Sequence, residues 1–272
     1  MRQTLSPVVF GLGKEESPFF ADVPFQKKQI MLYYRKQRNF QPKNREQAMI
    51  YFFADNHYQM EPGKHLLGKL SPELQKRIRF YQDDWAMLES GEWVDSCELL
   101  ILNMIAGTCN QPLPGPGAEK AVRRYCEKGG PILLLHGSSA AFWEWSWWRE
   151  LPGLRWVRPN DPDRQVASTH PKAPCSVRVT KTRHPLAAKL RPFDLPEDEI
   201  YTALEETAPF MTLMDTTVNG ETWPQCCETI SPWNGRIMSF IPGHQPVCTE
   251  NPDLVYNVET MVGYLLEGTV QS

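Results

Sequence analysis

Four polar residues stand beside short apolar runs, and their types suit proton transfer or metal binding. His136 directly follows the run ILLL, and His244 follows RIMSFIPG in the same way. The acidic pair Asp198 and Glu199 comes immediately before a β-like stretch, IYTAL. Imidazole and carboxylate groups can together hold a divalent metal such as zinc. They can equally serve as acid and base on a small polar substrate.

The segments that must position these groups are typical of an α/β protein. CELLILN at 97–103 and ILLL at 132–135 are runs of the kind that is buried on both faces of a parallel sheet. A helix predicted over 118–128, closed by two glycines, lies between them. The stretch 253–266 has one apolar stripe and should pack a final helix on the sheet. This alternation predicts an α/β fold with a mostly parallel central sheet, whose ligands gather outside the carboxyl ends of the strands.

Other segments carry further expectations. The pattern predicts a strand over 28–35, more helix than strand over 45–58, and a helix from Ser71-Pro72 to Gly91. After residue 175, short β-like pieces follow one another between Pro and Gly residues. These pieces are SVRVT, IYTAL, FMTLMD and RIMSFI.

Composition restricts the class of protein. The 272 residues are 41% hydrophobic and 22% charged, with a formal charge of −3 and therefore no basic footprint for nucleic acid. No apolar run approaches the roughly 18 residues that span a bilayer, and the N-terminus lacks the features of a signal peptide. We expect a cytoplasmic protein with no membrane partner. The seven Cys include no C-x-x-C pair, so we expect reduced thiols.

The aromatic stretch after His136 has two interpretations. In a helix that begins near Ser139, Trp143 and Trp147 share a face, and the tryptophans serve mostly as core anchors. Alternatively, Trp143 forms the apolar wall of a sugar-sized pocket. The turn lacks the G-x-S-x-G pattern, so Ser138 does not indicate a serine hydrolase.

The remaining histidines carry weaker signals. His170 and His184 are each followed by Pro, a pattern more typical of a loop than of catalysis. His57 and His65 lie in polar sequence that is typical of the surface. For the two histidines at strand ends, a structural role is as good an interpretation as a functional one when the residues alone are considered.

Three longer stretches contain a Leu-His-Gly turn, an Asp-Glu-x-Tyr segment and a Gly-Arg segment followed by Gly-His. They are YCEKGGPILLLHGSSAAFWEW, RHPLAAKLRPFDLPEDEIY and WNGRIMSFIPGH. Together they resemble the ThuA-like (trehalose utilisation) family, a branch of the class I glutamine amidotransferase-like superfamily. The resemblance covers roughly residues 97–266 and implies a flavodoxin-like three-layer sandwich. It marks these positions as candidates for the site: His136, Asp198, Glu199, Tyr201, Arg236 and His244.

The N-terminal part is less typical of that family. We predict a single ThuA-like domain over 1–272, in which residues 1–25 form an irregular arm and residues 26–96 a divergent part. The resemblance also argues against thiol chemistry. The amidotransferases of the superfamily place a Cys at the turn after this strand, whereas this chain has His136 there and Cys126 in the preceding helix.

The link of the family to carbohydrate catabolism, particularly of keto-disaccharides, implies an enzyme that acts on a sugar or keto-sugar glycoside. We expect His136, Glu199 and His244 to be catalytic, either by holding one divalent metal or by sharing acid and base roles. We also expect contacts with the substrate from five further residues: Ser138, Trp143, Asp198, Tyr201 and Arg236.

Two alternatives stay open. A non-catalytic carbohydrate-binding or regulatory module would keep the fold without the nucleophile, and an amidotransferase would use another of the thiols. Loss of turnover in a folded His136→Ala or His244→Ala variant indicates the enzyme, whereas loss of affinity alone indicates the module. The expected partner is a small-molecule carbohydrate, and the sequence leaves a homo-oligomer open.

Overall fold

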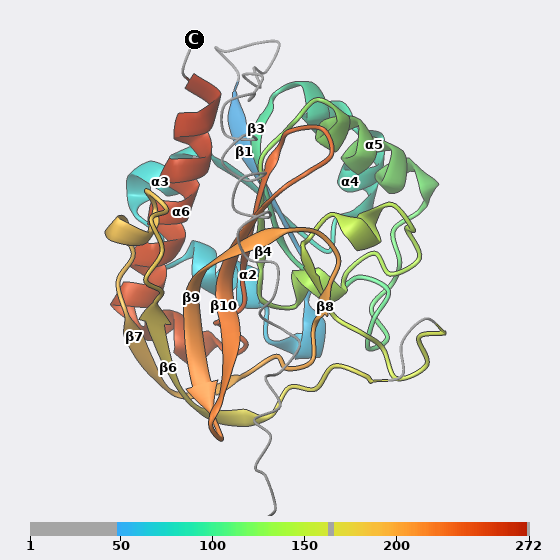
Figure 1. The fold of residues 1–272 in the computed structure, drawn as a ribbon. Helices are drawn as coiled ribbons and strands as arrows, with labels where there is room; N and C mark the ends of the chain where they lie inside the picture. The colour runs from blue at the N-terminus through green and yellow to red at the C-terminus, as the bar shows by residue number, and fades with distance from the viewer. Residues whose placement is uncertain (1–47, 163–165, 271–272) are drawn as a thin grey trace, which may run out of the picture. The chain divides into compact units, whose positions relative to one another are not determined.

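The structure is a computed structural model that describes residues 48–162 and 166–270, with side chains up to Glu267. Within these residues the chain forms a nine-stranded mixed sheet (Figure 1). The predicted arm over 1–25 and the predicted strand over 28–35 lie outside the described residues. In sheet order the strands are β2 (Ile78–Gln82), β1 (Met49–Ala54), β3 (Cys97–Asn103), β4 (Ile132–Leu135), β11 (Arg236–Phe240), β10 (Glu221–Ile230), β9 (Phe210–Val218), β6 (Lys172–Val179) and β7 (Phe193–Glu199).

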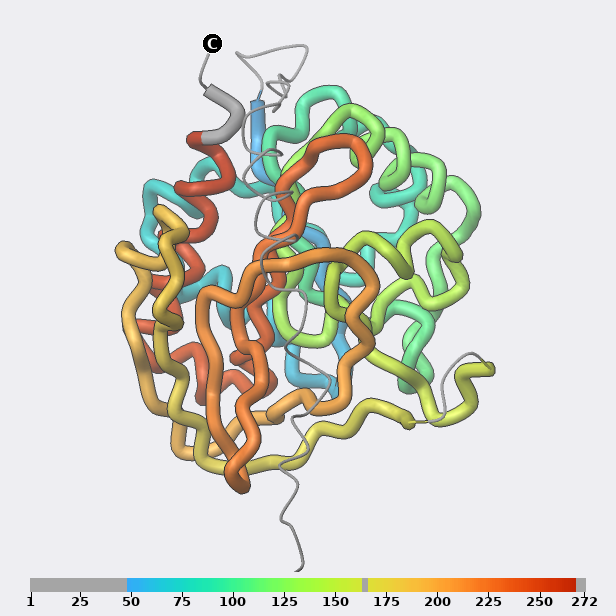
Figure 2. The backbone as a smooth tube through the Cα atoms, viewed as in Figure 1, coloured from blue at the N-terminus to red at the C-terminus, as the bar shows by residue number. Residues whose placement is uncertain are grey.

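Half of this sheet is parallel. Strands β2, β1, β3, β4 and β11 run in the same direction, and β10, β9, β6 and β7 extend the sheet with antiparallel pairs. The chain turns between β9 and β10 at Asn219-Gly220, which have φ of 54° and 83° (Figure 2). Two residues with positive φ form the turn whose twist suits a hairpin. A separate antiparallel pair joins β5 (Leu154–Arg155) to β8 (Glu205–Glu206).

Helices cover both faces of the parallel half, which gives the three layers of a flavodoxin-like sandwich (Figure 1). Alternate residues of β3 point to opposite faces. Leu99 and Ile101 pack with one hydrophobic cluster, and Leu100 and Leu102 pack with the other. The predicted α/β class is therefore confirmed. The α-helices of the described residues are α2 (Pro62–Leu67), α3 (Pro72–Arg77), α4 (Trp85–Ser90), α5 (Pro116–Glu127) and α6 (Pro252–Val270).

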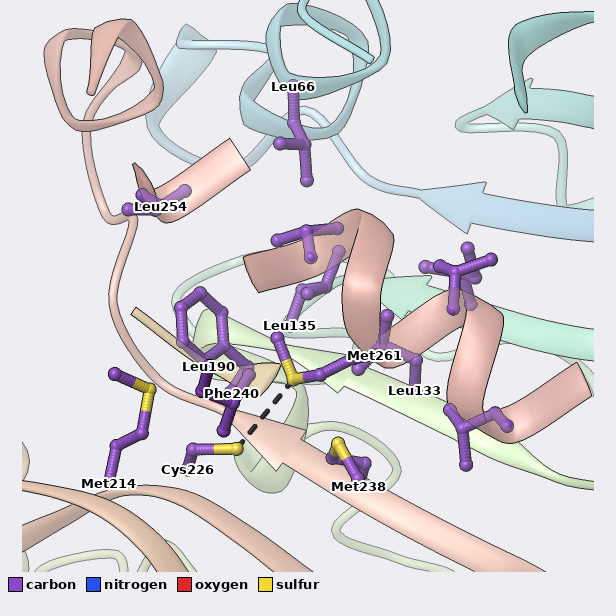
Figure 3. Close-up of a cluster of buried hydrophobic side chains, with 14 of the residues drawn as sticks. Leu66, Leu133, Leu135, Leu190, Met214, Cys226, Met238, Phe240, Leu254 and Met261 are labelled. Carbon is purple, nitrogen blue, oxygen red and sulfur yellow. Dashed lines mark hydrogen bonds between the residues drawn. The ribbon is translucent and has the colours of Figure 1, made fainter. Parts of the chain in front are cut away.

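The first cluster joins α2 and α6 to the sheet. Figure 3 shows the side chain of Met261, from α6, beside that of Cys226, from β10. Their sulfur atoms lie 3.7 Å apart. The second cluster packs α4 and α5 against the opposite face. All seven cysteines are free thiols, and six of them are buried. Among the described residues, no helix is long and apolar enough to cross a membrane.

Two of the predicted helices are wrong in part. Residues 49–54 form β1 rather than a helix, because β1 lies between β2 and β3 and its apolar side chains are needed on both faces. The helix predicted from Ser71 to Gly91 is interrupted by β2, which pairs with β1 at the edge of the sheet. Strands β3 and β4 are confirmed at their predicted bounds.

The strand predicted at IYTAL and the helix predicted from Ser139 are also wrong. Strand β7 ends at Glu199, and the residues after it contribute one isolated bridge, between Thr202 and Thr169. A 3-10 turn covers 136–140, and Phe142 then adopts a φ of 56°. That left-handed conformation cannot continue a helix, so Trp143 and Trp147 do not share a helical face.

Candidate functional site

Four parallel strands, β1, β3, β4 and β11, are neighbours, so their carboxyl ends meet at one edge of the sheet. Strand β1 continues into Asp55 and His57, β4 continues into His136, and the loop after β11 carries His244. Glu199, the last residue of β7, reaches the same place. This is the edge at which open α/β sheets gather ligands.

His136 occupies the sharp turn after β4 with a φ of 47°. The left-handed region costs about 1–2 kcal/mol for a residue with a Cβ. Its Nδ1 donates to the carbonyl oxygen of Ile241 at 2.9 Å, so the neutral ring carries its lone pair on Nε2. That Nε2 lies 3.1 Å from the hydroxyl of Tyr201 and 3.1 Å from Nδ1 of His244. A histidine that binds a metal through one ring nitrogen is commonly oriented by a hydrogen bond from its other ring nitrogen to a backbone carbonyl.

Glu199 completes the cluster. Its Oε2 lies 3.7 Å from Nε2 of His136, and its Oε1 lies 3.3 Å from Nε2 of His244. One ligand atom from each of the three residues falls within 4.8 Å of the other two. Bonds of about 2.0–2.1 Å to a tetrahedral ion place neighbouring ligand atoms about 3.3 Å apart. The three side chains therefore fit a single divalent metal.

Burial controls the protonation of this cluster. Loss of solvent, followed by the charge of His244, lowers the pKa of His136 to about 3, and burial lowers the pKa of His244 to about 4. Burial raises the pKa of Glu199, against the attraction of His170 and Lys172. Both strand-end imidazoles are therefore neutral at pH 7 and can bind a metal or accept a proton.

Tyr201 reaches the cluster as predicted. Its hydroxyl contacts His136, and burial raises the pKa of that hydroxyl well above its ordinary value, so it remains a hydrogen-bond donor. Two residues that were not predicted to belong to the site lie nearby: His170, whose His-Pro sequence was interpreted as a loop, and Trp156. Nδ1 of His170 lies 3.2 Å from Oε1 of Glu199. The ring of Trp156 packs edge-on against Tyr201, with 4.8 Å between centroids, and forms an apolar wall.

Asp198 and Ser138 use their polar side-chain atoms to hold the backbone of the site in place, and their contacts with a substrate stay a prediction. The two carboxylate oxygens of Asp198 accept the backbone N–H groups of Gly243 and His244 at 2.8 and 3.1 Å. Oγ of Ser138 accepts the N–H of Met104 and donates to backbone carbonyls of β3 and β4. These polar atoms already have hydrogen-bond partners within the protein, and both residues are buried.

Arg236 and Trp143 contact other parts of the protein than the cluster, and their contacts with a substrate stay a prediction. Arg236 begins β11 and so lies at the opposite edge of the sheet, where its guanidinium lies 4.7 Å from the ring centroid of Tyr264. The ring of Trp143 instead packs against two guanidinium groups. The charged ends of Arg155 and Arg158 lie 4.4 and 4.5 Å from its centroid.

His57 is buried at the site, although its sequence context predicted a surface position. Its Nδ1 lies 2.5 Å from Oδ1 of Asp55, and its ring centroid lies 6.4 Å from that of His136. The signal that could have found this pair is an acidic residue directly after a buried strand. That signal was missed because residues 45–58 were predicted to be more helix than strand.

The fold and the site together define an α/β sandwich with a histidine at the turn after one of its central strands. Residues 47–262 match the model of the ThuA family, described as trehalose utilisation. The chain belongs to the ThuA family. The match begins at residue 47, so it includes most of the stretch 26–96 that we expected to diverge.

Solved structures of two bacterial proteins are similar to this chain. The ThuA-like protein of Bacteroides uniformis ATCC 8492 is 16% identical with a TM-score of 0.60, and the alignment covers 82% of this chain and 92% of that chain. The ThuA-like protein of Parabacteroides merdae ATCC 43184 is 13% identical with a TM-score of 0.63, over 83% of this chain and 92% of that chain. At these identities the likeness shows the fold alone. No curated protein matches the sequence.

Proposed function

We propose that this protein is an enzyme that acts on a sugar or keto-sugar glycoside, with His136, Glu199 and His244 as its reactive groups. The description of the family supports a role related to carbohydrate. The observation that carries the proposal is the convergence of these three buried side chains, within 4.8 Å of one another, at the carboxyl edge of the parallel strands. Clusters of buried titratable groups with shifted pKa values are typical of functional sites.

The chemistry of the three side chains suits one divalent metal, for which zinc is the first candidate. A bound ion would polarise a carbonyl oxygen of the sugar as a Lewis acid. Tyr201, whose hydroxyl stays protonated, would donate to an oxygen of the same substrate. The half-buried ring of Trp156 would cover the apolar face of the sugar. Without a metal, the neutral imidazoles would accept protons and Glu199 would share the acid and base work.

Six of the seven thiols are buried, and these six do not support the amidotransferase alternative. Cys126 lies within α5 in the second hydrophobic cluster, and burial raises the pKa of its thiol. A buried thiol of raised pKa is a poor nucleophile.

The proposal is tested by metal binding and turnover in matched variants. Zinc stoichiometry and affinity are measured by calorimetry and elemental analysis for the wild type, His136→Ala and His244→Ala. His65→Ala is the control, because that side chain is 34% exposed and contacts Thr249 and Glu250 instead of the three cluster residues. The substrate probe is keto-trehalose, which is trehalose oxidised to a ketone at one ring carbon.

We expect one zinc ion per chain in the wild type and the control. Loss of a ligand should weaken zinc binding by more than about 100-fold, because removal of a mere orienting partner already costs 10–100-fold. Turnover of keto-trehalose should fall in parallel. Turnover by a metal-free wild type would assign the reaction to acid–base chemistry alone. A wild type that neither binds zinc nor converts the keto-sugar would contradict the proposal.

A further inference from the structure

We propose that His57, held by Asp55, is the base that takes a proton from a substrate bound at the His136–Glu199–His244 cluster. This inference rests on the proposed function and adds a residue that the cluster does not contain. His57 comes from the loop after β1, two strands away from the one that precedes His136.

Asp55 determines which nitrogen of His57 carries the proton. Both residues are fully buried. Oδ2 of Asp55 accepts the backbone N–H of Ile105 at 2.8 Å, and Oδ1 lies 2.5 Å from Nδ1 of His57. A carboxylate can only accept in such a contact, so Nδ1 is the protonated nitrogen. The lone pair of the neutral ring is therefore on Nε2.

Nε2 of His57 is buried and has no hydrogen-bond partner among the described residues. Leaving a buried polar atom without a partner costs free energy, and a catalytic role is one of the explanations for such an atom. The rings that surround His57 belong to His136, at 6.4 Å and nearly parallel, and to Tyr58. Tyr58 in turn packs against His244. The ring of His57 therefore borders the cluster.

His57 is better placed as a base than as a further ligand. Of the described residues, His136, Glu199 and His244 alone form a group whose ligand atoms all lie within 4.8 Å of one another. The cluster can hold an oxygen of the substrate, directly or through an ion. The separate pair of Asp55 and His57 is then available to remove a proton from the carbon next to the one that carries this oxygen.

The step is a proton transfer that consumes no other reactant. The C–H bond beside the carbonyl group of a keto-sugar breaks, and its proton moves to Nε2 of His57. The electron pair of that bond forms a C=C bond while the carbonyl oxygen takes up the negative charge. Asp55 stabilises the imidazolium that results, as a carboxylate does in other buried Asp–His pairs. His57 then returns the proton to the same carbon, which regenerates the ketone. Where the ketone stands two carbons from the anomeric carbon, the carbonyl can instead re-form while the electron pair of the enolate makes a C=C bond to the anomeric carbon. The bond from that carbon to the glycosidic oxygen then breaks, and the departing oxygen takes the proton from His57.

The experiment follows exchange of that proton for deuterium. The full-length protein is loaded with zinc and mixed with keto-trehalose in D₂O, and proton NMR records the loss of the signal beside the ketone. The variants are His57→Gln and Asp55→Asn, and His65→Gln is the matched control. We expect His57→Gln to exchange at least about 100-fold more slowly, which is the usual contribution of a general base. Added imidazole should restore part of the rate.

Asp55→Asn should slow exchange in a similar way. Its amide would donate to Nδ1 and so shift the proton of His57 to Nε2, where the lone pair is needed. Zinc affinity should be unchanged in both variants, because neither residue belongs to the metal cluster. This combination of lost exchange, retained zinc and rescue by imidazole would not arise from a merely structural role.

Three results would overturn the inference. Exchange at the wild-type rate in folded His57→Gln would show that His57 is not the base. The proposed role of His136, Glu199 and His244 would be unaffected by that result. Loss of zinc from that variant would make His57 a ligand. If thermal denaturation shows His57→Gln to be unfolded, Asp55→Asn decides by the same criteria. Absence of both exchange and turnover in the zinc-loaded wild type would overturn the proposed function together with this inference.

Discussion

The backbone N–H of His244 donates to Oδ1 of Asp198 at 3.1 Å, and the N–H of Gly243 donates to Oδ2 at 2.8 Å. Asp198 thereby ties the loop after β11 to the end of β7, where Glu199 follows it. Asp198→Ala leaves three buried backbone N–H groups, those of Glu199, Gly243 and His244, without their acceptor. A hydrogen bond to a charged group contributes about 1.5–3 kcal/mol. We expect the free energy of unfolding, measured in urea, to fall by about 3 kcal/mol or more.

Asp198→Asn is the matched control for that change. The amide oxygen can still accept the N–H groups that reach one of the two carboxylate oxygens, so the loss of stability should be smaller. Zinc affinity should follow the same order, since His244 is displaced most in the alanine variant. Equal stability of the wild type and Asp198→Ala would show that the loop is held by other contacts.

Stability should also depend on pH through the two strand-end histidines. Burial lowers the pKa of His136 to about 3 and that of His244 to about 4, from an ordinary value of 6.5. Between pH 6.5 and pH 4 the unfolded chain therefore binds more protons than the folded chain, so stability is lost as the pH falls through this window. Each histidine should account for about 2 kcal/mol between pH 7 and pH 5, measured by urea unfolding with a chelator present.

His136→Asn isolates one of these two contributions. Asn tolerates the left-handed conformation at this position and does not titrate. The variant should lose about half as much stability on acidification as the wild type. The raised pKa values of Asp198 and Glu199 act in the opposite direction, but both carboxylates are present in both proteins. The same pH dependence in the variant and the wild type would contradict the buried, neutral state of His136.

Gly137, next to His136, is a position where no side chain fits. A Cβ there would lie 2.5 Å from Cγ2 of Ile105 and 3.3 Å from the hydroxyl of Tyr201. Gly137→Ala should therefore lower the free energy of unfolding by about 1–3 kcal/mol, as overpacking does. Gly263→Ala is the control, because a Cβ at that point of α6 meets no described atom within 4 Å. It should gain about 0.5–1 kcal/mol, and thermal unfolding of the two variants should separate them.

The centre of the fold could be predicted from the sequence because β3 and β4 are short and apolar on both faces. The region of β1 and β2 could not. Apolar residues at 48, 49, 52 and 53 fit a helix as well as a strand, and only the pairing of β1 between β2 and β3 decides between them. Tertiary pairing here overrides the local spacing.

The candidate site, too, could be predicted from the sequence only in part. His136 and His244 could be predicted to meet because both follow strands, and the carboxyl ends of parallel strands share an edge. His57 could not be placed, because its strand was interpreted as a helix. Trp156 lies between β5 and β6, and no local pattern shows that it packs on Tyr201. Trp143 follows His136 closely in sequence, but the turns after residue 140 direct it to Arg155 instead.

Tyr58 covers two of the buried imidazoles. Its ring packs edge-on against His57 and His244, with centroids at 5.8 and 5.6 Å, while the residue itself is 52% exposed. Tyr58→Ala should open both rings to reagents. Modification by diethyl pyrocarbonate, followed by mass spectrometry, should become faster at His57 and His244 but not at the partly exposed His65. Tyr58→Phe keeps the ring and loses only the hydrogen bond to Cys109, so it should remain protected. Equal rates in all three proteins would show that Tyr58 does not control access.

Removal of Trp156 should weaken substrate binding, whereas removal of Trp143 should lower the stability of the fold. Trp156 contacts Tyr201 and His170 beside the cluster, so Trp156→Ala should raise KM for keto-trehalose about tenfold, which corresponds to about 1.4 kcal/mol of lost binding. Trp143 packs against the guanidinium groups of Arg155 and Arg158. Trp143→Ala should therefore leave KM unchanged and lower the free energy of unfolding by about 1–2 kcal/mol. Steady-state kinetics and urea unfolding of both variants check the pair. A rise in KM confined to Trp143→Ala would show that Trp143, and not Trp156, forms the apolar wall of the sugar site.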